Sequence, residues 1–429
     1  MKRGTSALLW LLSILILALS PVYAQEQQPA QPTQPTQPAE PAEKPLAPGW
    51  LSLDSTVGVV DGMIADGKGA LQKALGIGIS GYLDTSYTWS SNHPHNPANI
   101  SGRYFDKDYN KIEFNDFHLE LDLPQDTFGV GYHVSGDFGR TGELLREATR
   151  WNDSFLKQPS AELRESYITT TIPIGAGLQF KGGLFVTPLG TEILPAPGSY
   201  NDEISRSFAF NLGVPLRHLG TLFTYPALKT LSVSGGLVTG WDDPHDNNNS
   251  PSFLGGVNFT PADAFGLASN IIVGPEQAAP TGRTRLTWSN VATIKPIDPL
   301  TIYLEYTLGH EDQAPTFVGN QNSWWNAVAG VASYNWTDRF NTAFRGEVFV
   351  DSQGARTFAS GIFAPLNPVH SVTLGEITMA GTYKFTKMLL GRAEFRQDWA
   401  NHGVFQVGKA GTGADSNQTS LAVQLIYTY

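Results

Sequence analysis

Eight charged residues lie in three segments near the C-terminal end of the chain: three in 345–351, one at 376 and four in 392–398, spaced by even numbers within a segment. In a β-strand, residues two apart project from the same face, so the charges of each segment would lie on one side of its strand. Opposed charges beside a water-filled passage create a transverse field that sorts solutes by charge. The alternative is a lattice of ion pairs that braces a wall. The eight residues are Arg345, Glu347, Asp351, Glu376, Arg392, Glu394, Arg396 and Asp398.

A second group of charges lies in and around the long polar segment 188–214. A connection of this length between two strands either folds inward and narrows a passage or covers its outer end. We expect it to fold inward and form a constriction, with nearby arginines on the basic side; plain wall positions are the alternative for the arginines. The candidates are Glu192, Asp202, Glu203, Arg206, Arg217, Arg283 and Arg285.

A cluster of oxygen-bearing side chains follows Trp241, at Asp242, Asp243, Asp246 and 247–249. Clustered carboxylates attract Ca²⁺, but this spacing differs from that of an EF-hand loop. Asp and Asn also favour turns, and turn formation is the role that we expect here. The sequence therefore predicts no metal site and no cofactor.

The motifs of common enzymes do not occur in the sequence. Its nine histidines include no HExxH pair, and no nucleophile elbow, P-loop or dinucleotide fingerprint stands in a strand–helix setting. The lack of cysteine excludes thiolate nucleophiles and iron–sulfur clusters. His118 with Asp116, or His133 with Asp137, could serve a hydrolase in a barrel wall, but such pairs are common by chance. We therefore do not expect an enzyme.

The composition favours a membrane protein that is built from strands. Charged residues make up 16 % of the 429 residues, against about 25 % in ordinary soluble domains. The net charge of −11 argues against nucleic acid as a partner. Outside the N-terminus, no apolar run approaches the ~18 residues of a membrane helix, so strands would have to cross the membrane.

The first 75 residues divide into three segments. Residues 1–24 combine a basic start, an apolar run and a small-residue end, which predicts a cleaved secretory signal peptide. Residues 25–50 are rich in Pro and Gln, which predicts an extended periplasmic spacer. Residues 51–75 fit a short amphipathic helix or a mobile extension.

From residue 76 to residue 429, apolar and polar residues alternate. In 389–399, for example, every odd position is uncharged, while the even positions carry four of the charged residues named above. Seven short connections interleave with eight longer polar ones, of which 309–323 is one, as in outer-membrane barrels with tight turns at one end and long loops at the other. We predict an all-β fold: a transmembrane antiparallel up-and-down β-barrel of about 16 strands, with 14 or 18 as alternatives.

Seven short segments follow one another in a characteristic order through this region. They are GISGYLDTSYTW (78–89), LRESYITTTIP (163–173), KGGLFVTPLGTE (181–192), SRSFAF (205–210), GWDDPHDNNN (240–249), RGEVFVD (345–351) and GRAEFRQD (391–398). In this order they resemble the OmpL-like family of β-barrel porins. The resemblance implies an outer-membrane, porin-like pore of a Gram-negative envelope, without catalytic residues or an assigned substrate. Tyr429 stands where such barrels end in an aromatic residue that assembly machinery is thought to recognise.

The expected function is passive diffusion of small hydrophilic solutes or ions through a charge-lined lumen in the outer membrane. The alternatives are a non-conducting structural or adhesin-type barrel and, from a different class, a barrel-embedded hydrolase. Expected partners are outer-membrane lipid and lipopolysaccharide, the permeating solutes and the barrel-assembly machinery. A homotrimer is a further expectation for a sixteen-stranded pore.

Overall fold

The computed structural model describes residues 61, 67–69, 76–95, 99–125, 129–149, 160–196, 202–278, 282–316, 318–363, 371–409 and 413–429. The predicted signal peptide (1–24) and spacer (25–50) lie outside the described residues, as does nearly all of 51–75. Those three segments therefore stay predictions.

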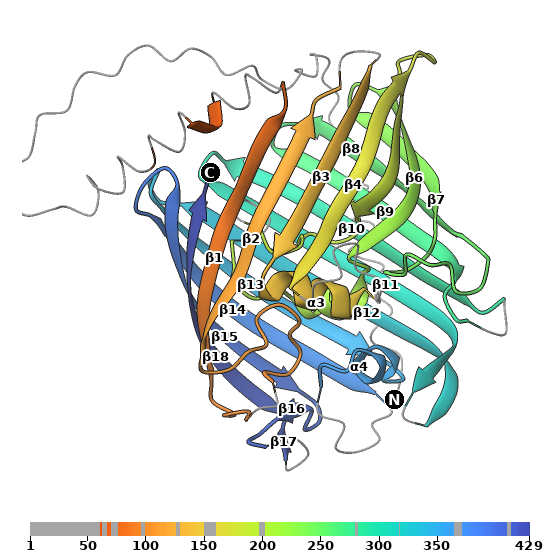
Figure 1. Ribbon diagram of the computed structural model, residues 1–429. Coiled ribbons are helices and arrows are strands. Elements are labelled where there is room, and N and C mark those ends of the chain that lie inside the picture. Colours follow the sequence, from red (N-terminus) through yellow and green to blue (C-terminus); the bar gives the residue numbers. More distant parts are fainter. Residues whose placement is uncertain are drawn as a thin grey trace, which may run out of the picture. The chain divides into compact units, whose positions relative to one another are not determined.

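Sixteen strands form one closed sheet (Figure 1). Neighbouring strands are antiparallel and follow one another in sequence order, and the barrel closes where β1 pairs with β18. This confirms the predicted all-β barrel and its strand count. The strands are β1 (Gly78–Ser90), β2 (Ile112–Leu123), β3 (Val130–Phe138), β4 (Ala161–Ile172), β5 (Leu178–Val186), β6 (Arg217–Leu228), β7 (Leu231–Val238), β8 (Ser252–Ala262), β9 (Phe265–Pro275), β10 (Thr284–Ile297), β11 (Leu300–Thr316), β12 (Gly319–Asn335), β13 (Phe340–Asp351), β14 (Val372–Lys384), β15 (Leu389–Ala400) and β18 (Asn417–Thr428).

The apolar face of the strands points out of the barrel. On β13, Phe344 and Val348 are 47 % and 46 % exposed, whereas Arg345 and Glu347, between them in the sequence, are buried. Because successive side chains point to opposite faces, a closed sheet with this pattern has an apolar outside and a charged inside. That is the reverse of a soluble barrel and the arrangement required in hydrocarbon.

One predicted loop is mostly strand. The segment 309–323 was expected to form a long polar connection, but β11 and β12 continue as a paired ladder up to Thr316 and Gly319. The ladder resumes after an irregularity between Glu311 and Ala314, and His310 packs on Trp324 across it, with ring centroids 4.1 Å apart. Cross-strand pairing of this kind satisfies the backbone and stabilises the hairpin, although the local sequence is polar.

The longer connections carry the few remaining elements. They are α3 (Arg140–Ala148), the π-helix η1 (Ala209–Gly213), α4 (Ala355–Ala359) and a small hairpin of β16 (Phe405–Gln406) with β17 (Ala414–Asp415). Among the described residues, no helix has the length and apolar character needed to cross a membrane.

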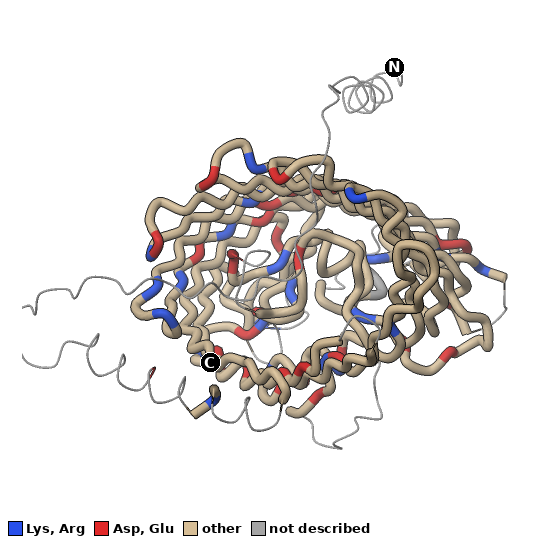
Figure 2. Tube along the Cα trace, turned by 90° about the horizontal axis from the view of Figure 1, so that it is seen from above, with Lys and Arg blue, Asp and Glu red and all other residues tan. Residues whose placement is uncertain are grey.

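Part of the interior is apolar. Segment 188–214 connects β5 and β6, and its residues Leu189, Phe208 and Leu212 are buried in a cluster with Trp325 of β12 and Phe349 of β13. Figure 2, a view turned by 90°, shows connecting chain inside the ring of strands. The barrel therefore encloses a packed segment as well as charged wall residues.

Candidate functional site

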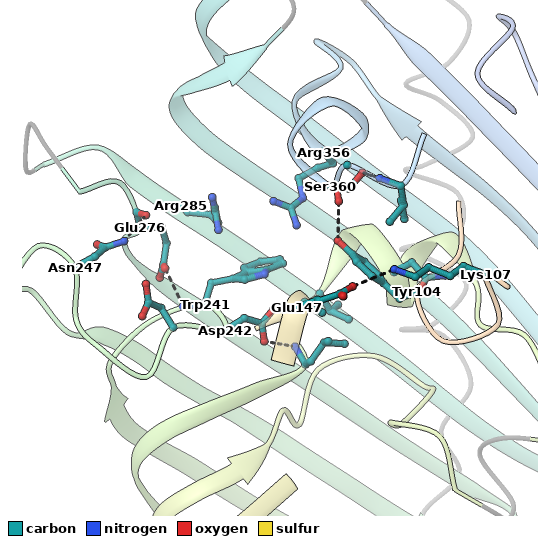
Figure 3. A pocket seen from close by; sticks show the side chains of 17 residues that line it. Tyr104, Lys107, Glu147, Trp241, Asp242, Asn247, Glu276, Arg285, Arg356 and Ser360 are labelled. Carbon is teal, nitrogen blue, oxygen red and sulfur yellow. Dashed lines mark hydrogen bonds and ion pairs between the residues drawn. The ribbon is translucent and has the colours of Figure 1, made fainter. Parts of the chain in front are cut away.

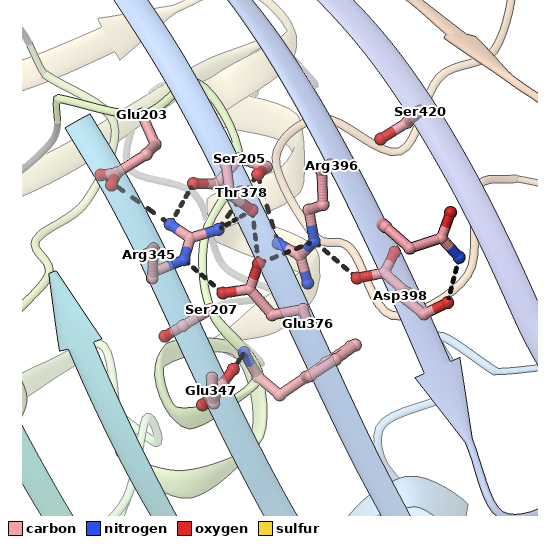
Figure 4. A network of polar contacts seen from close by, with 12 residues as sticks. Glu203, Ser205, Ser207, Arg345, Glu347, Glu376, Thr378, Arg396, Asp398 and Ser420 are labelled. Atoms are coloured by element: carbon pink, nitrogen blue, oxygen red, sulfur yellow. Dashed lines mark hydrogen bonds and ion pairs between the residues drawn. The ribbon is translucent and has the colours of Figure 1, made fainter. Parts of the chain in front are cut away.

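Arg345 lies at the centre of a network between the wall and segment 188–214 (Figure 4). Its Nε lies 2.6 Å from Oε1 of Glu376 on the next strand, and its Nη1 lies 2.9 Å from Oε1 of Glu192 in the segment. The same Nη1 donates to the carbonyl of Ser205 at 2.9 Å. Glu203 approaches to 4.0 Å. The side chain of Arg345 is fully buried, so its charge is compensated from both wall and segment, as a buried charge requires.

Arg396 on β15 forms the second half of this network. Its Nε lies 2.6 Å from Oδ1 of Asp398 and 3.7 Å from Oε2 of Glu376, and its Nη1 donates to the carbonyl of Arg206 at 2.6 Å. Asp398 in turn pairs with Arg103 of the β1–β2 connection at 3.0 Å. The charges thus join three strands to two loops.

Two wall carboxylates bind the backbone of segment 188–214 directly. Glu347 accepts N–H bonds from Phe208 at 2.6 Å and from Ala209 at 2.5 Å. Glu394 accepts N–H bonds from Ile204 at 2.5 Å and Ser205 at 3.1 Å. Hydrogen bonds to charged groups contribute about 1.5–3 kcal/mol each, so these four contacts are a strong local attachment.

The segment is attached to strands far apart around the barrel. The carbonyl of Pro188 accepts a bond from Asn270 of β9 at 2.8 Å, and the carbonyl of Pro195 accepts one from Tyr82 of β1. The N–H of Gly190 donates to Ser289 of β10 at 3.0 Å, and the N–H of Thr191 donates to Glu305 of β11 at 2.8 Å. Asp202 accepts a bond from Ser333 of β12 at 2.5 Å. Contacts with β1, with β9 to β13 and with β15 mean that the segment lies across the interior.

Burial changes the acidity of one carboxyl in the segment. Burial raises the pKa of Glu203 to about 7. Arg345 opposes this shift, whereas the neighbouring carboxylates Glu192, Glu394 and Asp202 increase it. Glu203 therefore titrates near neutral pH while it lies against the wall.

Two members of the charged row lie outside this network. Asp351 accepts bonds from the N–H and the hydroxyl of Thr357, at 2.8 and 2.9 Å, and so holds the start of α4. Arg392 makes a long contact of 3.5 Å with Gln424 on β18. The row therefore divides into a central network and two flanking positions.

The four candidate arginines do not converge. Arg206 donates to carbonyls of its own segment, at Ile193, Glu203 and Ile204. The other three are placed as follows: Arg217 pairs with Glu162 at 2.7 Å, Arg283 donates to Gln277 at 2.9 Å, and Arg285 pairs with Glu311 at 2.9 Å. Among the described residues they form no single basic face, because Arg206 lies in the segment, Arg217 begins β6, and Arg283 and Arg285 lie at the start of β10.

A second charged cluster lies on β1 to β4 around Arg164, and the sequence analysis did not predict it. Arg164 binds Asp137 with two nitrogens, at 2.6 and 2.9 Å, and lies 3.5 Å from Asp116. His118 contacts Asp137 at 2.8 Å and lies in one cluster with Asp116, their ligand atoms within 4.8 Å of one another. His133 contacts Asp122 at 2.9 Å rather than Asp137. The spacing of Glu162 and Arg164 was the available signal.

Two groups of side chains on these strands have the donor types of a metal site. Asp116, His118 and Asp137 form one, and Glu120, Asp122 and His133 the other, with ligand atoms within 4.8 Å of one another. In the first group, Arg164 and His118 already satisfy Asp137, and a cation would have to displace a guanidinium. The arrangement is that of a self-compensated ion-pair cluster.

The acidic cluster after Trp241 forms turns and also supports β6. Asp243 accepts the N–H of His245 and Asp246 that of Asn248, both at 3.0 Å, as in the expected Asx turns. Asp242 is buried and accepts N–H bonds from Leu216 at 2.6 Å and Arg217 at 3.0 Å. Burial raises the pKa of Asp242 to about 6 against these bonds.

A cavity of about 300 Å³ lies beside this cluster, and we call it the Trp241 cavity (Figure 3). It is lined by residues from several loops and one strand, including Tyr104, Trp241, Asp242, Glu276, Arg285 and Arg356. Asn211 and Val214 of segment 188–214 also line it. The cavity is therefore next to the segment that crosses the interior.

The fold is similar to that of solved outer-membrane channels. The outer membrane channel DcaP of Acinetobacter baumannii has a TM-score of 0.56 at 13 % identity, over 82 % of this chain and 97 % of that chain. OmpT of Vibrio cholerae in its trimer form (0.53, 14 %) and an anion-selective porin from Comamonas acidovorans (0.53, 11 %) each match over 82 % of this chain and 99 % of theirs. At these identities the likeness shows a shared fold. No curated protein matches the sequence.

The family match covers the whole barrel. Residues 76–429 match the family described as "Putative beta-barrel porin-2, OmpL-like", from just before β1 to the last residue. The closed sheet of sixteen strands, apolar outside and charged inside, is the architecture that such a family requires. The chain therefore belongs to this OmpL-like family of outer-membrane β-barrel porins.

Proposed function

We propose that the lumen conducts small hydrophilic solutes and ions passively, past a constriction that segment 188–214 forms against the charged wall. The observation that supports this most is the attachment of the segment to β1, to β9 through β13 and to β15. A segment anchored on many sides narrows the lumen without depending on any one contact. Passage then depends on solute size and on the charges beside the segment.

The charged row has both roles that we considered for it. Glu347 and Glu394 hold the segment by its backbone, whereas Arg345 and Arg396 join it to the neighbouring strands. These groups brace the constriction and also carry the charges nearest to it. The electric field at the constriction therefore depends on how completely neighbouring carboxylates compensate the charge of each arginine.

The apolar cluster favours a narrow passage. Leu189, Phe208 and Leu212 pack on Trp325 and Phe349 inside the barrel, and packed apolar side chains exclude water. The alternative that follows is a non-conducting structural barrel, in which the segment closes the lumen. The hydrolase is not proposed, because the family and the similar structures are porins and channels.

The outward face sets the partners that we propose. Exposed side chains such as Phe344, Met379 and Leu421 would contact outer-membrane lipid and lipopolysaccharide. We further propose export by a cleaved signal peptide at 1–24 and insertion by barrel-assembly machinery. A homotrimer is proposed from the similar OmpT, which was solved in a trimer form.

Single-channel recording tests the proposal directly. The mature chain, refolded in detergent, is added to a planar lipid bilayer in potassium chloride solution. We expect stepwise insertions with a constant unit conductance. Folding is checked in the same preparation by β-rich circular dichroism and by a heat-modifiable band in SDS electrophoresis. Correctly folded protein that never conducts would overturn the proposal and leave the closed structural barrel.

A further inference from the structure

We propose that the Trp241 cavity binds the carboxylate or phosphate group of a small anionic solute, with Arg356 as the principal contact and Arg285 opposite it. The site would load such solutes beside the constriction, a role that rests on the proposed channel function. The site depends on Arg356, which has no ion-pair partner among the described residues, and on the cavity in front of its guanidinium.

Arg356 donates through Nε to the carbonyl of Leu212 at 2.7 Å. Among the described residues, no carboxylate lies within ion-pair distance of its guanidinium, and neither terminal nitrogen has a hydrogen-bond partner. A guanidinium has five N–H donors, so four N–H groups remain available. They belong to a side chain that lines the cavity.

Arg285 adds a second positive charge to the same place. The guanidinium carbons of Arg285 and Arg356 lie 5.1 and 4.8 Å from the ring centroid of Trp241, and Arg356 also lies 5.3 Å from that of Trp325 (Figure 3). Burial, together with the charge of Arg285, lowers the pKa of Arg356 to about 10. Arg356 thus remains charged at neutral pH in a place that disfavours the charge, and a bound anion would compensate that charge.

The acidic side chains of the cavity are engaged elsewhere. Asp242 accepts the two N–H bonds at the start of β6, and Glu276 accepts the N–H of Trp241 at 2.8 Å and the hydroxyl of Ser252 at 2.7 Å. Glu147 pairs with Lys107 at 3.1 Å, and Arg285 is matched by Glu311. Asp243, which also lines the cavity, accepts the N–H of His245 at 3.0 Å. Among the described lining residues, Arg356 is therefore the cation without an ion-pair partner.

Size and position suit a small solute. A volume of about 300 Å³ is at the lower end for small-molecule sites and suits a short dicarboxylate or inorganic phosphate. Arg356 and Trp325 donate to the carbonyls of Leu212 and Gly213, which belong to the constricting segment. An anion bound at Arg356 would thus lie next to the constriction, because Arg356 itself contacts the constricting segment.

Calorimetric titration of the detergent-solubilised full chain tests the site without requiring conduction. The probes are succinate and inorganic phosphate, with glycerol as a neutral comparison. We expect saturable binding of at least one anion, weakened at least tenfold in Arg356→Gln and within twofold of wild type in Arg339→Gln. The latter removes the same charge from the turn between β12 and β13. Arg356→Lys, which keeps the charge, should restore part of the affinity.

The outcomes separate this site from the channel. Binding by a barrel that does not conduct would support the site and overturn the channel. Conduction without binding of either anion to the wild type would overturn the site. Equal affinity in wild type and Arg356→Gln would also overturn it. Should Arg356→Gln fail to fold, the wild-type titrations and Arg356→Lys still decide the matter.

Discussion

At Arg345 the cost of burying a charge is offset by contacts from two directions. Glu376 approaches along the wall and Glu192 from the segment that crosses the lumen. Removing one partner from such a buried set typically costs 3–5 kcal/mol, because it leaves an uncompensated charge. Glu203, at 4.0 Å from the same guanidinium, is held less tightly. It is the residue at which pH should act on the constriction.

The prediction at this scale concerns Glu203 and pH. With its pKa raised to about 7 from about 4.5, the folded chain holds the proton more tightly than the unfolded chain. The stabilising contribution is thus complete below about pH 4.5 and is lost as the pH rises through 7. The loss approaches about 3 kcal/mol at pH 8.

Urea unfolding of wild type and Glu203→Gln in lipid vesicles measures this effect. The two should be similar at pH 5, and the variant should be more stable at pH 8. Arg345, Glu192, Glu394 and Asp202 also act on Glu203, but they are present in both proteins and largely cancel in the difference. A stability difference that is the same at both pH values would contradict the assignment.

At the scale of the element, segment 188–214 is positioned by wall carboxylates more than by its own structure. Among its described residues, the one regular piece is η1, which is five residues long and too short to be stable alone. Glu347 and Glu394 each accept two of its backbone N–H bonds. Those two side chains belong to β13 and β15, so the rigid wall determines where the segment lies.

The prediction at this scale is that the double variant Glu347→Gln/Glu394→Gln releases the segment. A neutral amide accepts weaker hydrogen bonds than a carboxylate, and the loss acts at both anchors. We expect a single-channel conductance at least 1.5 times that of wild type and faster protease cleavage within 188–214. The matched control Glu113→Gln/Glu120→Gln removes two charges from β2. Unchanged conductance and cleavage in the folded double variant would show that the apolar cluster alone holds the segment.

At the scale of the whole molecule, closure of the sheet separates the surroundings of the barrel from its interior. β1 pairs with β18 over nine positions, from Tyr82 with Thr428 to Ser90 with Ser420, so no strand edge is left along these positions. Closure satisfies the backbone hydrogen bonds that hydrocarbon cannot satisfy. It also makes every second residue of a strand a lipid contact and the others an interior contact.

The prediction at this scale tests the outward face. Val348 is in the middle of β13 and 46 % exposed, so Val348→Arg would place a charge in hydrocarbon. The expected cost is about 2–4 kcal/mol, measured as the change in unfolding free energy in lipid vesicles. Asp263→Arg, in the turn between β8 and β9, should change it by less than about 0.5 kcal/mol. An equal effect at both positions would refute the lipid-facing assignment of β13.

The sequence by itself determined the barrel. The alternation around Arg392 and Arg396 predicted strands with one charged face, and the interleaved short and long connections predicted about sixteen of them, a count that the closed sheet confirms. The alternation is a local signal, because side-chain direction in a strand has a period of two whatever the strand pairs with. The segment 309–323 has a polar sequence, but β11 and β12 pair with each other along most of it, so the prediction of a loop there was wrong.

Only the tertiary structure decided which groups meet in the lumen. That Glu347 binds the backbone of Phe208, that Arg164 shares Asp137 with His118, and that Arg356 faces Trp241 are contacts between residues far apart in the chain. Such contacts depend on closure of the sheet and on the path of a long loop. Backbone N–H groups are the same in every sequence, so no residue pattern could identify those that bind Glu347 and Glu394.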